Sequence, residues 1–312
     1  MPHLLVAGKL HPSGLKLLQG SGHSFDYVEA ITEASYQEAL PRAEAIVIRT
    51  QPLGAASIAK APGLQIVSRH GVGYDAVDVA ALNARGIPLC IVGDVNSAGV
   101  AEHAMMLILA ASHRLIAADR ATRSGNWAWR NGLQTHEVAG KTLLIVGFGR
   151  IGRHLAGMAR AFGMKVAAYD PYVTDWPDLA TRVTDLTEGL RAADAVSLHL
   201  PRADRVILGA SELAAMKPGA VVVNTARGGL IDEAALARAL AGHLGAAGIE
   251  VFDAEPPAQD HPLFGLENAI LTPHNAALTV ECAERMALAS VQNVLDFFAG
   301  RLDPSLIVNK VS

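Results

Sequence analysis

Short apolar runs alternate with amphipathic stretches along almost the whole chain of 312 residues. Apolar runs of this length predict buried strands, and the stretches between them have the spacing of helices. Strands that alternate with helices form parallel sheets covered by helices, so the pattern predicts an α/β fold. In the first third of the chain the predicted strands are His3–Ala7, Ala45–Arg49, Gln65–Ser68 and Leu89–Val92.

A second series of the same kind begins at Thr142. Before it, Ser97–Arg123 is apolar on most faces, which predicts one helix that is buried or lies at an interface. A loop that contains Trp127 follows this helix. The predicted strands of the second series are Thr142–Gly147, Lys165–Tyr169, Ala195–His199, Ala220–Asn224, Ala246–Val251 and Ala269–Leu271.

The two series predict two α/β domains. We place the first unit at residues 1–96 and the second at residues 97–282. The length of the last helical stretch favours a return of residues 283–312 to the first unit. The predicted domains are therefore 1–96 with 283–312, and 97–282.

Composition narrows the function classes. A net charge of −4 provides no electrostatic footprint for nucleic acid or for an anionic membrane. The N-terminal apolar run Leu4–Ala7 is too short for a signal peptide, and Ala104–Ala111 is far below the ~20 residues that span a bilayer. Cys90 and Cys282 have no metal-binding spacing, so we expect a cytoplasmic protein without a metal site.

The segment Lys141–Pro171 contains a dinucleotide fingerprint, Gly147-x-Gly149-x-x-Gly152. It follows a predicted strand and begins a predicted helix, which is the context that such a motif requires. The first glycine permits a tight turn, the second lets a pyrophosphate approach the backbone, and the third lets helix and strand pack closely. The helix N-terminus then offers free N–H groups to the phosphates.

Asp170 ends the next strand, 18 residues beyond Gly152. An acidic side chain there accepts hydrogen bonds from the ribose hydroxyls and repels a 2′-phosphate, so the sequence favours NAD over NADP. Arg150 is as consistent with a solvated side chain as with a pyrophosphate contact. The cofactor contacts expected from this segment are Gly147, Gly149, Arg150, Ile151, Gly152, Asp170 and Pro171.

Arg227, Glu255 and His274 each follow a predicted strand of the second series. Ligands bind outside the carboxyl ends of strands in an open parallel sheet, so the three side chains are expected to meet in one crevice with the cofactor. A histidine can remove or supply a hydroxyl proton at neutral pH. A carboxylate can orient its ring, and an arginine can hold a substrate carboxylate in bidentate fashion.

These segments resemble the D-isomer-specific 2-hydroxyacid dehydrogenases, which include D-3-phosphoglycerate dehydrogenase and glyoxylate/hydroxypyruvate reductase. The similarity covers nearly the whole chain. Besides the fingerprint, it includes Ile46–Thr50, Arg69–Asp78, Asn96–Met105, Ser197–Pro201, Met216–Asp232 and Thr272–Ala277.

The resemblance implies a Rossmann NAD-binding domain plus a smaller flavodoxin-like substrate-binding domain, with the active site in the cleft. It implies Arg227, Glu255 and His274 as the catalytic set, and a homodimer joined through Ser97–Arg123 and the Trp127 loop. Substrate contacts are expected at Arg49, Gly71, Val72, Gly73, Arg227 and His274, and further cofactor contacts at His199, Pro201, Thr225, Ala226 and Glu250.

The chain departs from the family pattern at two places. Glu250 stands where the family usually has an aspartate that holds the nicotinamide carboxamide, and the segment after Pro201 is shorter than usual. For His199 and Pro201, a core or capping role competes with the cofactor contact.

The expected activity is the NAD-dependent interconversion of a small D-2-hydroxy acid and its 2-oxo acid, as in phosphoglycerate dehydrogenase. Because the sequence ends at Ser312, we expect no C-terminal regulatory domain, so glyoxylate or hydroxypyruvate reduction stays open. A phosphate-bearing substrate would need further cations, for which Arg49, Arg69, Arg130 and Lys141 are candidates. The alternative of another class is an NAD-sensing binding protein, similar to the corepressors of this fold.

Overall fold

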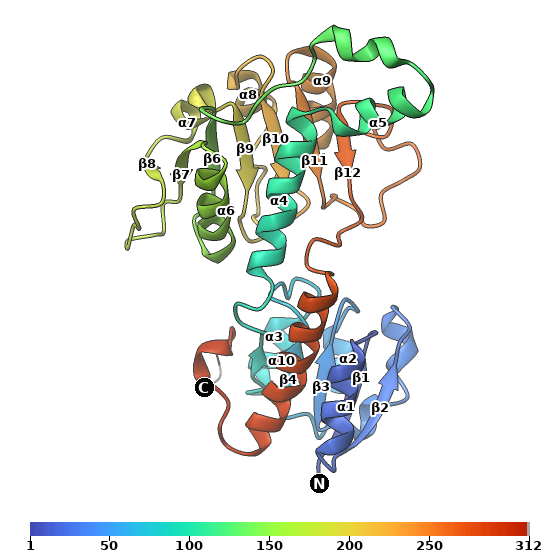
Figure 1. Cartoon of the computed structure of the whole chain (residues 1–312). Helices are drawn as coiled ribbons and strands as arrows, with labels where there is room; N and C mark the ends of the chain where they lie inside the picture. The colour runs from blue at the N-terminus through green and yellow to red at the C-terminus, as the bar shows by residue number, and fades with distance from the viewer. Residues whose placement is uncertain (311–312) are drawn as a thin grey trace. The chain divides into compact units, whose positions relative to one another are not determined.

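The computed structural model describes residues 1–310, and contacts between residues divide the chain into two compact units. The first unit is Met1–Asn96 with Leu278–Ser312, and the second is Ser97–Ala277. Each unit is a parallel sheet with helices, which confirms the predicted α/β class (Figure 1).

The first unit has a five-stranded sheet in the order β2-β1-β3-β4-β5, and every strand pair is parallel. This is the flavodoxin-like order 2-1-3-4-5. Its central strands β1 and β3 are nearly continuous apolar runs, as expected for strands that are buried on both faces. The strands are β1 (His3–Ala7), β2 (Ser24–Val28), β3 (Ala45–Ile48), β4 (Ile66–Arg69) and β5 (Leu89–Cys90).

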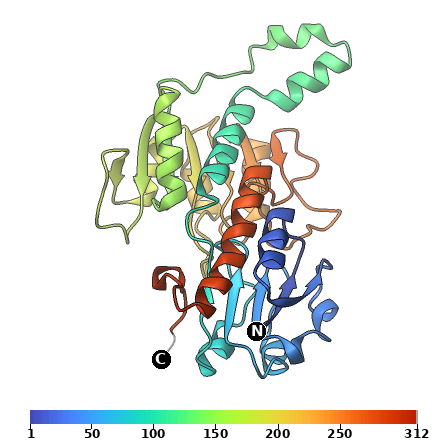
Figure 2. The ribbon, with the colours of Figure 1, turned by 60° about the horizontal axis from the view of Figure 1, so that its bottom comes forward.

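The long helix near the C-terminus, α10 (Val280–Phe298), packs against α1 (Pro12–Gly20) and over β3 and β4 of this first unit (Figures 1 and 2). A side chain at Gly14 of α1 would come within 2.9 Å of the Ala287 side chain of α10, so the glycine permits the close approach of the helices. The other helices of the unit are α2 (Ala55–Ala59), α3 (Val79–Ala84) and short 3-10 helices over Glu33–Tyr36, Leu40–Arg42 and Pro304–Leu306.

The second unit has a seven-stranded parallel sheet in the order β12-β11-β10-β9-β6-β7-β8. Strands β6 to β11 follow the Rossmann order 3-2-1-4-5-6, and β12 extends the sheet by one strand. The strand order reverses between β6 and β9, where ligands of this fold bind. The strands are β6 (Thr142–Val146), β7 (Lys165–Tyr169), β8 (Thr181–Val183), β9 (Ala195–Leu198), β10 (Val221–Asn224), β11 (Ala246–Ile249) and β12 (Ala269–Leu271).

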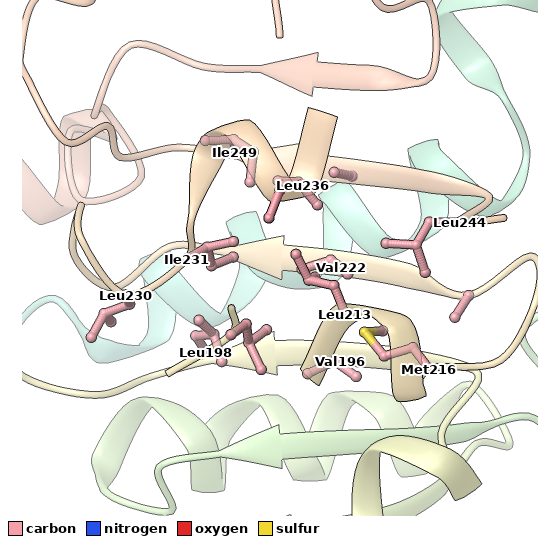
Figure 3. Close-up of a cluster of buried hydrophobic side chains, with 14 of the residues drawn as sticks. Val196, Leu198, Leu213, Met216, Val222, Leu230, Ile231, Leu236, Leu244 and Ile249 are labelled. Carbon is pink, nitrogen blue, oxygen red and sulfur yellow. The ribbon is translucent and has the colours of Figure 1, made fainter. Parts of the chain in front are cut away.

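Apolar side chains fill both faces of this sheet. On one face, Leu198 of β9, Val222 of β10 and Ile249 of β11 pack against Leu213 and Leu236 from two helices (Figure 3). Burial of one such side chain stabilises the fold by roughly 1.5–3 kcal/mol relative to exposure. The helices of the unit are α4 (Ser97–Ser112), α5 (Leu115–Arg123), α6 (Arg150–Ala161), α7 (Leu186–Ala192), α8 (Ala210–Ala215), α9 (Glu233–Gly242) and a 3-10 helix over Trp127–Gly132.

The segment predicted as one helix over Ser97–Arg123 is two helices with a bend of 57° between them. The break follows Ser112, and Arg114 has a left-handed backbone with φ 49°. Helix α4 packs on α6, β10 and β11, whereas residues after it project away from the sheet of this unit (Figure 2). No single helix within residues 1–310 has the length and hydropathy of a membrane span, and α4 with α5 passes that test only as a bent pair.

Candidate active site

The fingerprint glycines form the turn between β6 and α6, and two of them occupy positions that admit no side chain. Gly147 has φ 96°, and a Cβ atom there would lie 2.4 Å from the His199 carbonyl oxygen. A Cβ atom on Gly152 would lie 2.4 Å from the Gly147 carbonyl oxygen. At Gly149, by contrast, an added Cβ would meet no atom within 4 Å. The turn is thus closed on its protein side and open where a ligand would approach.

The N-terminus of α6 is available to an anion. Gly149 is its N-cap residue and supplies no side-chain hydrogen bond to the first turn, which begins at Arg150 and Ile151. Backbone N–H groups without intrahelical partners give a helix N-terminus its affinity for phosphate. The open position above Gly149 and this uncapped turn therefore fit the pyrophosphate of a dinucleotide.

Asp170 lies at the carboxyl end of β7, next to the glycine turn. Its Oδ2 accepts a hydrogen bond from the Phe148 N–H at 2.8 Å, and its Oδ1 accepts one from the Tyr172 N–H at 2.9 Å. These bonds fix the carboxylate beside the fingerprint while leaving lone pairs for ribose hydroxyls. Pro171, the next residue, is exposed.

Two buried polar atoms at the ends of β9 and β10 have no partner within residues 1–310. They are Nδ1 of His199 and Oγ1 of Thr225. Buried polar atoms are rarely left unpaired, and a bound ligand is one way to satisfy them. Beside Thr225, the Ala226 N–H donates to the Asn224 side chain, so it is already satisfied, and Pro201 is exposed. The orphaned atoms, the open glycine turn and Asp170 together fit an NAD-type cofactor.

A histidine–carboxylate pair forms after β11 and β12. His274 Nδ1 lies 2.6 Å from Glu255 Oε2, and the other Glu255 oxygen accepts the Phe252 N–H at 3.1 Å. A carboxylate on Nδ1 holds the proton there and leaves Nε2 as the ring atom that exchanges protons with a substrate. Half of the His274 side chain is exposed. The structure therefore brings together two of the three residues predicted to be catalytic.

Arg227 lies in the loop after β10, which neighbours β11 in the sheet. Asn224 holds this loop, since its amide donates to the Arg227 carbonyl at 2.9 Å. A Cβ atom on Gly228 would lie 1.9 Å from the Phe252 carbonyl oxygen, so glycine lets the loops after β10 and β11 touch. Arg227 Nη1 donates to the Ala226 carbonyl at 2.6 Å. The guanidinium thus belongs to the same edge of the sheet as the His274–Glu255 pair.

Glu250 directly follows β11, and its side chain is only 1% exposed. Its carboxylate accepts hydrogen bonds from the Thr272 hydroxyl and the Ala276 N–H. His103 of α4 lies beside it, with Nε2 3.3 Å from Glu250 Oε2. A nicotinamide contact at Glu250 stays a prediction, since in the structure both of its oxygens bind within the protein. Sequence reasoning missed His103 and Thr272 as partners of this carboxylate.

The predicted substrate contacts of the first unit lie at the carboxyl ends of β3 and β4. Gly71 has φ 141°, and the Val72 and Gly73 N–H groups have no acceptor in the described part of the chain. Arg49 Nη1 donates to the Lys9 carbonyl at 3.2 Å, and Arg69 Nη1 donates to the His70 carbonyl at 2.8 Å. This corner of the first unit therefore combines the Arg49 guanidinium with backbone N–H donors that an anion can use.

Of the other candidate cations for a phosphate, Lys141 precedes β6 and so lies at the amino end of the strands, opposite the fingerprint. Arg130 lies over the Trp127 ring at 5.7 Å, in the segment that follows α5. Lys141 is therefore excluded as a cation that binds a substrate phosphate at the carboxyl ends of the strands. The sequence alone does not show at which end of the sheet this lysine lies.

The lowered pKa values of two buried histidines predict how the free energy of unfolding depends on pH. Burial lowers the pKa of His199 to about 3, and burial together with Arg49 and Arg69 lowers the pKa of His70 to about 3. The unfolded chain binds protons at these residues below about pH 6.5, whereas the folded chain does not. The free energy of unfolding is therefore expected to fall by about 1.4 kcal/mol per pH unit for each histidine as the pH drops from 6.5 toward 5.

Urea unfolding at several pH values between 5 and 7 measures this dependence. His70→Gln should reduce the slope by about one proton. His136→Gln, at an exposed position, is the control and should leave the slope unchanged. An unchanged slope in His70→Gln would show that His70 is protonated in the folded state.

Comparison with known proteins agrees with this geometry. Residues 105–276 match the family model "D-isomer specific 2-hydroxyacid dehydrogenase, NAD binding domain". The chain belongs to the D-isomer specific 2-hydroxyacid dehydrogenase family. This membership confirms the resemblance noted in the sequence, and it identifies the second unit as the NAD-binding domain of the family.

Individual relatives carry different activities. The chain is 40% identical to the D-3-phosphoglycerate dehydrogenase of Mycobacterium tuberculosis, over 98% of this chain and 59% of the length of that protein. It is 33% identical to the glyoxylate reductase of Aeropyrum pernix, over 99% of this chain and 97% of that protein. A crystal structure of Aquifex aeolicus D-lactate dehydrogenase with NAD and lactic acid superposes with a TM-score of 0.89, at 28% identity, over 99% of this chain and all of that one.

Proposed function

We propose that this chain is an NAD-dependent oxidoreductase that interconverts a D-2-hydroxy acid and its 2-oxo acid. The observation that carries the proposal is the His274–Glu255 pair at 2.6 Å, on the same sheet edge as Arg227 and the fingerprint turn. An imidazole with one nitrogen held by a carboxylate and the other accessible is suited to general acid–base work.

The protein's own residues divide the work. His274 Nε2 takes the hydroxyl proton during oxidation and returns it during reduction, while Glu255 holds the ring and stabilises its protonated form. Arg227 binds the substrate carboxylate. The bound NAD supplies the hydride chemistry. Asp170, the glycine turn and the first turn of α6 hold that cofactor. In the first unit, Arg49 and the Gly71–Gly73 backbone stay the predicted contacts of a substrate anion.

Two classes of 2-oxo acid are candidates for the substrate. The 40% identity to a D-3-phosphoglycerate dehydrogenase favours a phosphoglycerate-like acid, whereas similarity to a glyoxylate reductase and to a glyoxylate/hydroxypyruvate reductase favours glyoxylate or hydroxypyruvate. NADH oxidation measured with 3-phosphohydroxypyruvate, hydroxypyruvate, glyoxylate and pyruvate tests the proposal. We expect turnover with at least one of these acids. Tight NADH binding without turnover on a wider panel of 2-oxo acids would instead support an NAD-sensing binding protein.

Asp170 is expected to set the preference for NAD. Asp170→Asn removes the charge that repels a 2′-phosphate while retaining one acceptor oxygen beside Phe148. The ratio of NADH to NADPH affinity should therefore fall by about tenfold, which corresponds to about 1.4 kcal/mol. Fluorescence titration with both nucleotides measures this ratio. Asp175→Asn is the matched control, and an equal loss of both affinities in Asp170→Asn would contradict the proposed discrimination.

We also propose a homodimer and a reducing compartment such as the cytoplasm. Large apolar side chains are exposed on and after α5, at Leu115, Ile116, Trp127 and Leu133. Monomeric proteins rarely expose many such side chains close together, so a second copy of the chain is a suitable cover. Both cysteines are free and buried, which is consistent with a compartment that forms no disulfides.

A further inference from the structure

A buried cluster around Glu250 reaches the loop that carries His274. The Thr272 hydroxyl donates to Glu250 Oε2 and is 3.1 Å from His103 Nε2. On the far side of His274, the Ala276 N–H donates to Glu250 Oε1. The carboxylate therefore joins both ends of the loop, and His103 connects it to α4.

The backbone of Glu250 adds a third connection. Its carbonyl oxygen accepts the His274 N–H at 3.1 Å, so this one residue contacts the loop before, at and after the imidazole. His274 has a left-handed backbone with φ 51°. This conformation costs a residue other than glycine about 1–2 kcal/mol, and it persists only where the surroundings impose it.

The cluster also keeps Glu250 charged. Burial raises the pKa of this carboxyl, but the hydrogen bonds from His103, Thr272 and the Ala276 N–H outweigh burial and hold the pKa below its usual value. Hydrogen bonds to an ionised acceptor are stronger than those between neutral groups. A charged, inaccessible carboxylate with donors from the loop and from α4 is thus a firm support for the loop.

We propose that Glu250 is a positioning residue, which holds the Thr272–Ala276 loop so that His274 meets both Glu255 and the substrate. The proposal rests on the proposed function only in taking His274 as the proton-exchanging group. It assigns to Glu250 a role different from a contact with the nicotinamide carboxamide. The two roles differ in what a substitution changes: loop order and kcat in the first, cofactor affinity in the second.

Glu250→Gln tests the proposal with nearly unchanged shape. A glutamine has one acceptor oxygen and one donor nitrogen, and the nitrogen must face either the Ala276 N–H or the Thr272 hydroxyl and His103. Neutral hydrogen bonds then replace charge-assisted ones, and either the Thr272 hydroxyl must accept where it donated or the Ala276 N–H loses its acceptor. We expect kcat to fall by roughly 10- to 100-fold, the cost of a misplacement of about 1 Å, while the Kd for NADH changes by less than about threefold.

Hydrogen exchange followed by mass spectrometry measures the opening of the Thr272–Ala276 loop directly and does not depend on catalytic turnover. The peptide that covers residues 270–280 should exchange faster in Glu250→Gln, because the Ala276 N–H loses its acceptor in part of the molecules. Thr272→Val, which removes only the hydroxyl, should change kcat and exchange in the same direction by a smaller factor. Asp194→Asn is the matched control. The Asp194 carboxylate accepts hydrogen bonds from the Thr142 N–H and the Lys217 ammonium group at the amino end of the strands, away from the loop.

Two results would overturn the proposal. One is wild-type exchange and wild-type kcat in both Glu250→Gln and Thr272→Val. The other is an unchanged kcat with a raised Kd for NADH, which would assign Glu250 to the cofactor. Failure of the proposed function looks different: the wild type itself would then turn over no 2-oxo acid, or His274→Ala would keep the wild-type kcat. Loop exchange in Glu250→Gln would still report whether the carboxylate holds the loop.

Discussion

His274→Ala is expected to lower kcat by roughly 10²- to 10⁴-fold, the usual contribution of a general acid–base side chain. Glu255 binds Nδ1 of the His274 ring, so Nε2 is the ring nitrogen that can exchange a proton with the substrate. The affinity for NADH should stay within about threefold, since the side chain of His274 contributes nothing to the fingerprint turn or to Asp170. Stopped-flow and steady-state assays with NADH and the best 2-oxo acid measure the loss.

Matched variants separate chemistry from folding. His243→Gln changes a histidine of the same unit whose Nε2 bonds to the Leu213 carbonyl, away from the site, and should retain wild-type kcat. Glu255→Gln keeps the size of the side chain but removes the charge that stabilises a protonated ring, so its kcat should lie between those of the wild type and His274→Ala. Full activity in His274→Ala would refute the assigned role.

Arg227→Ala is expected to lower kcat/KM for the 2-oxo acid by roughly 10²- to 10³-fold. Loss of a buried charged hydrogen-bond partner costs about 2–5 kcal/mol, and a guanidinium pairs with a carboxylate through two parallel bonds. The glycine turn and Asp170 lie on other loops, and Thr225, on the same loop as Arg227, keeps its side chain in this variant, so NADH affinity should change little. Initial rates over a range of 2-oxo acid concentrations measure kcat and KM separately.

Arg227→Lys tests the geometry of that contact. Lysine retains the charge but cannot make a planar bidentate pair, so we expect it to recover only part of the loss. Arg238→Ala, at an exposed position of α9, is the control for removal of a positive charge from the unit. Equal activity in Arg227→Ala and the wild type would exclude Arg227 from substrate binding.

Features that depend on local sequence were predictable. The fingerprint, Asp170 and the residues after β10, β11 and β12 could be placed because strand runs and glycine turns are adjacent in the chain. The strands Lys165–Tyr169 and Ala269–Leu271 were predicted with the bounds that the structure has. Since parallel strands expose their carboxyl ends at one edge, correct strand positions were sufficient to bring Glu255 and His274 to the same edge.

Elements with weak local signals were missed. Strand β2 (Ser24–Val28) is partly exposed at the edge of its sheet and contains Asp26, and β8 (Thr181–Val183) has only three residues. The break after Ser112 has neither glycine nor proline to mark it. Pairing with β1 and with β7 defines the two edge strands, and the helix break separates the buried α4 from the largely exposed α5.

The environment of Glu250 could not be predicted for a similar reason. Its partners His103 and Thr272 are far from it in the chain, and only the folded sheet and α4 bring them together. The resemblance implies a cofactor contact at this position, and that contact stays a prediction. The structure shows that the Glu250 carboxylate also binds Thr272 and Ala276, on either side of His274.

The most direct test of hydride transfer to C2 uses NADH with deuterium at the transferable C4 position and the best 2-oxo acid of the panel. The wild type should form a product with deuterium on C2 and the D configuration, and His274→Ala and Arg227→Ala should form it at least 10²-fold more slowly. Tight binding of NADH with no deuterium on C2 of any acid would contradict the proposed hydride transfer.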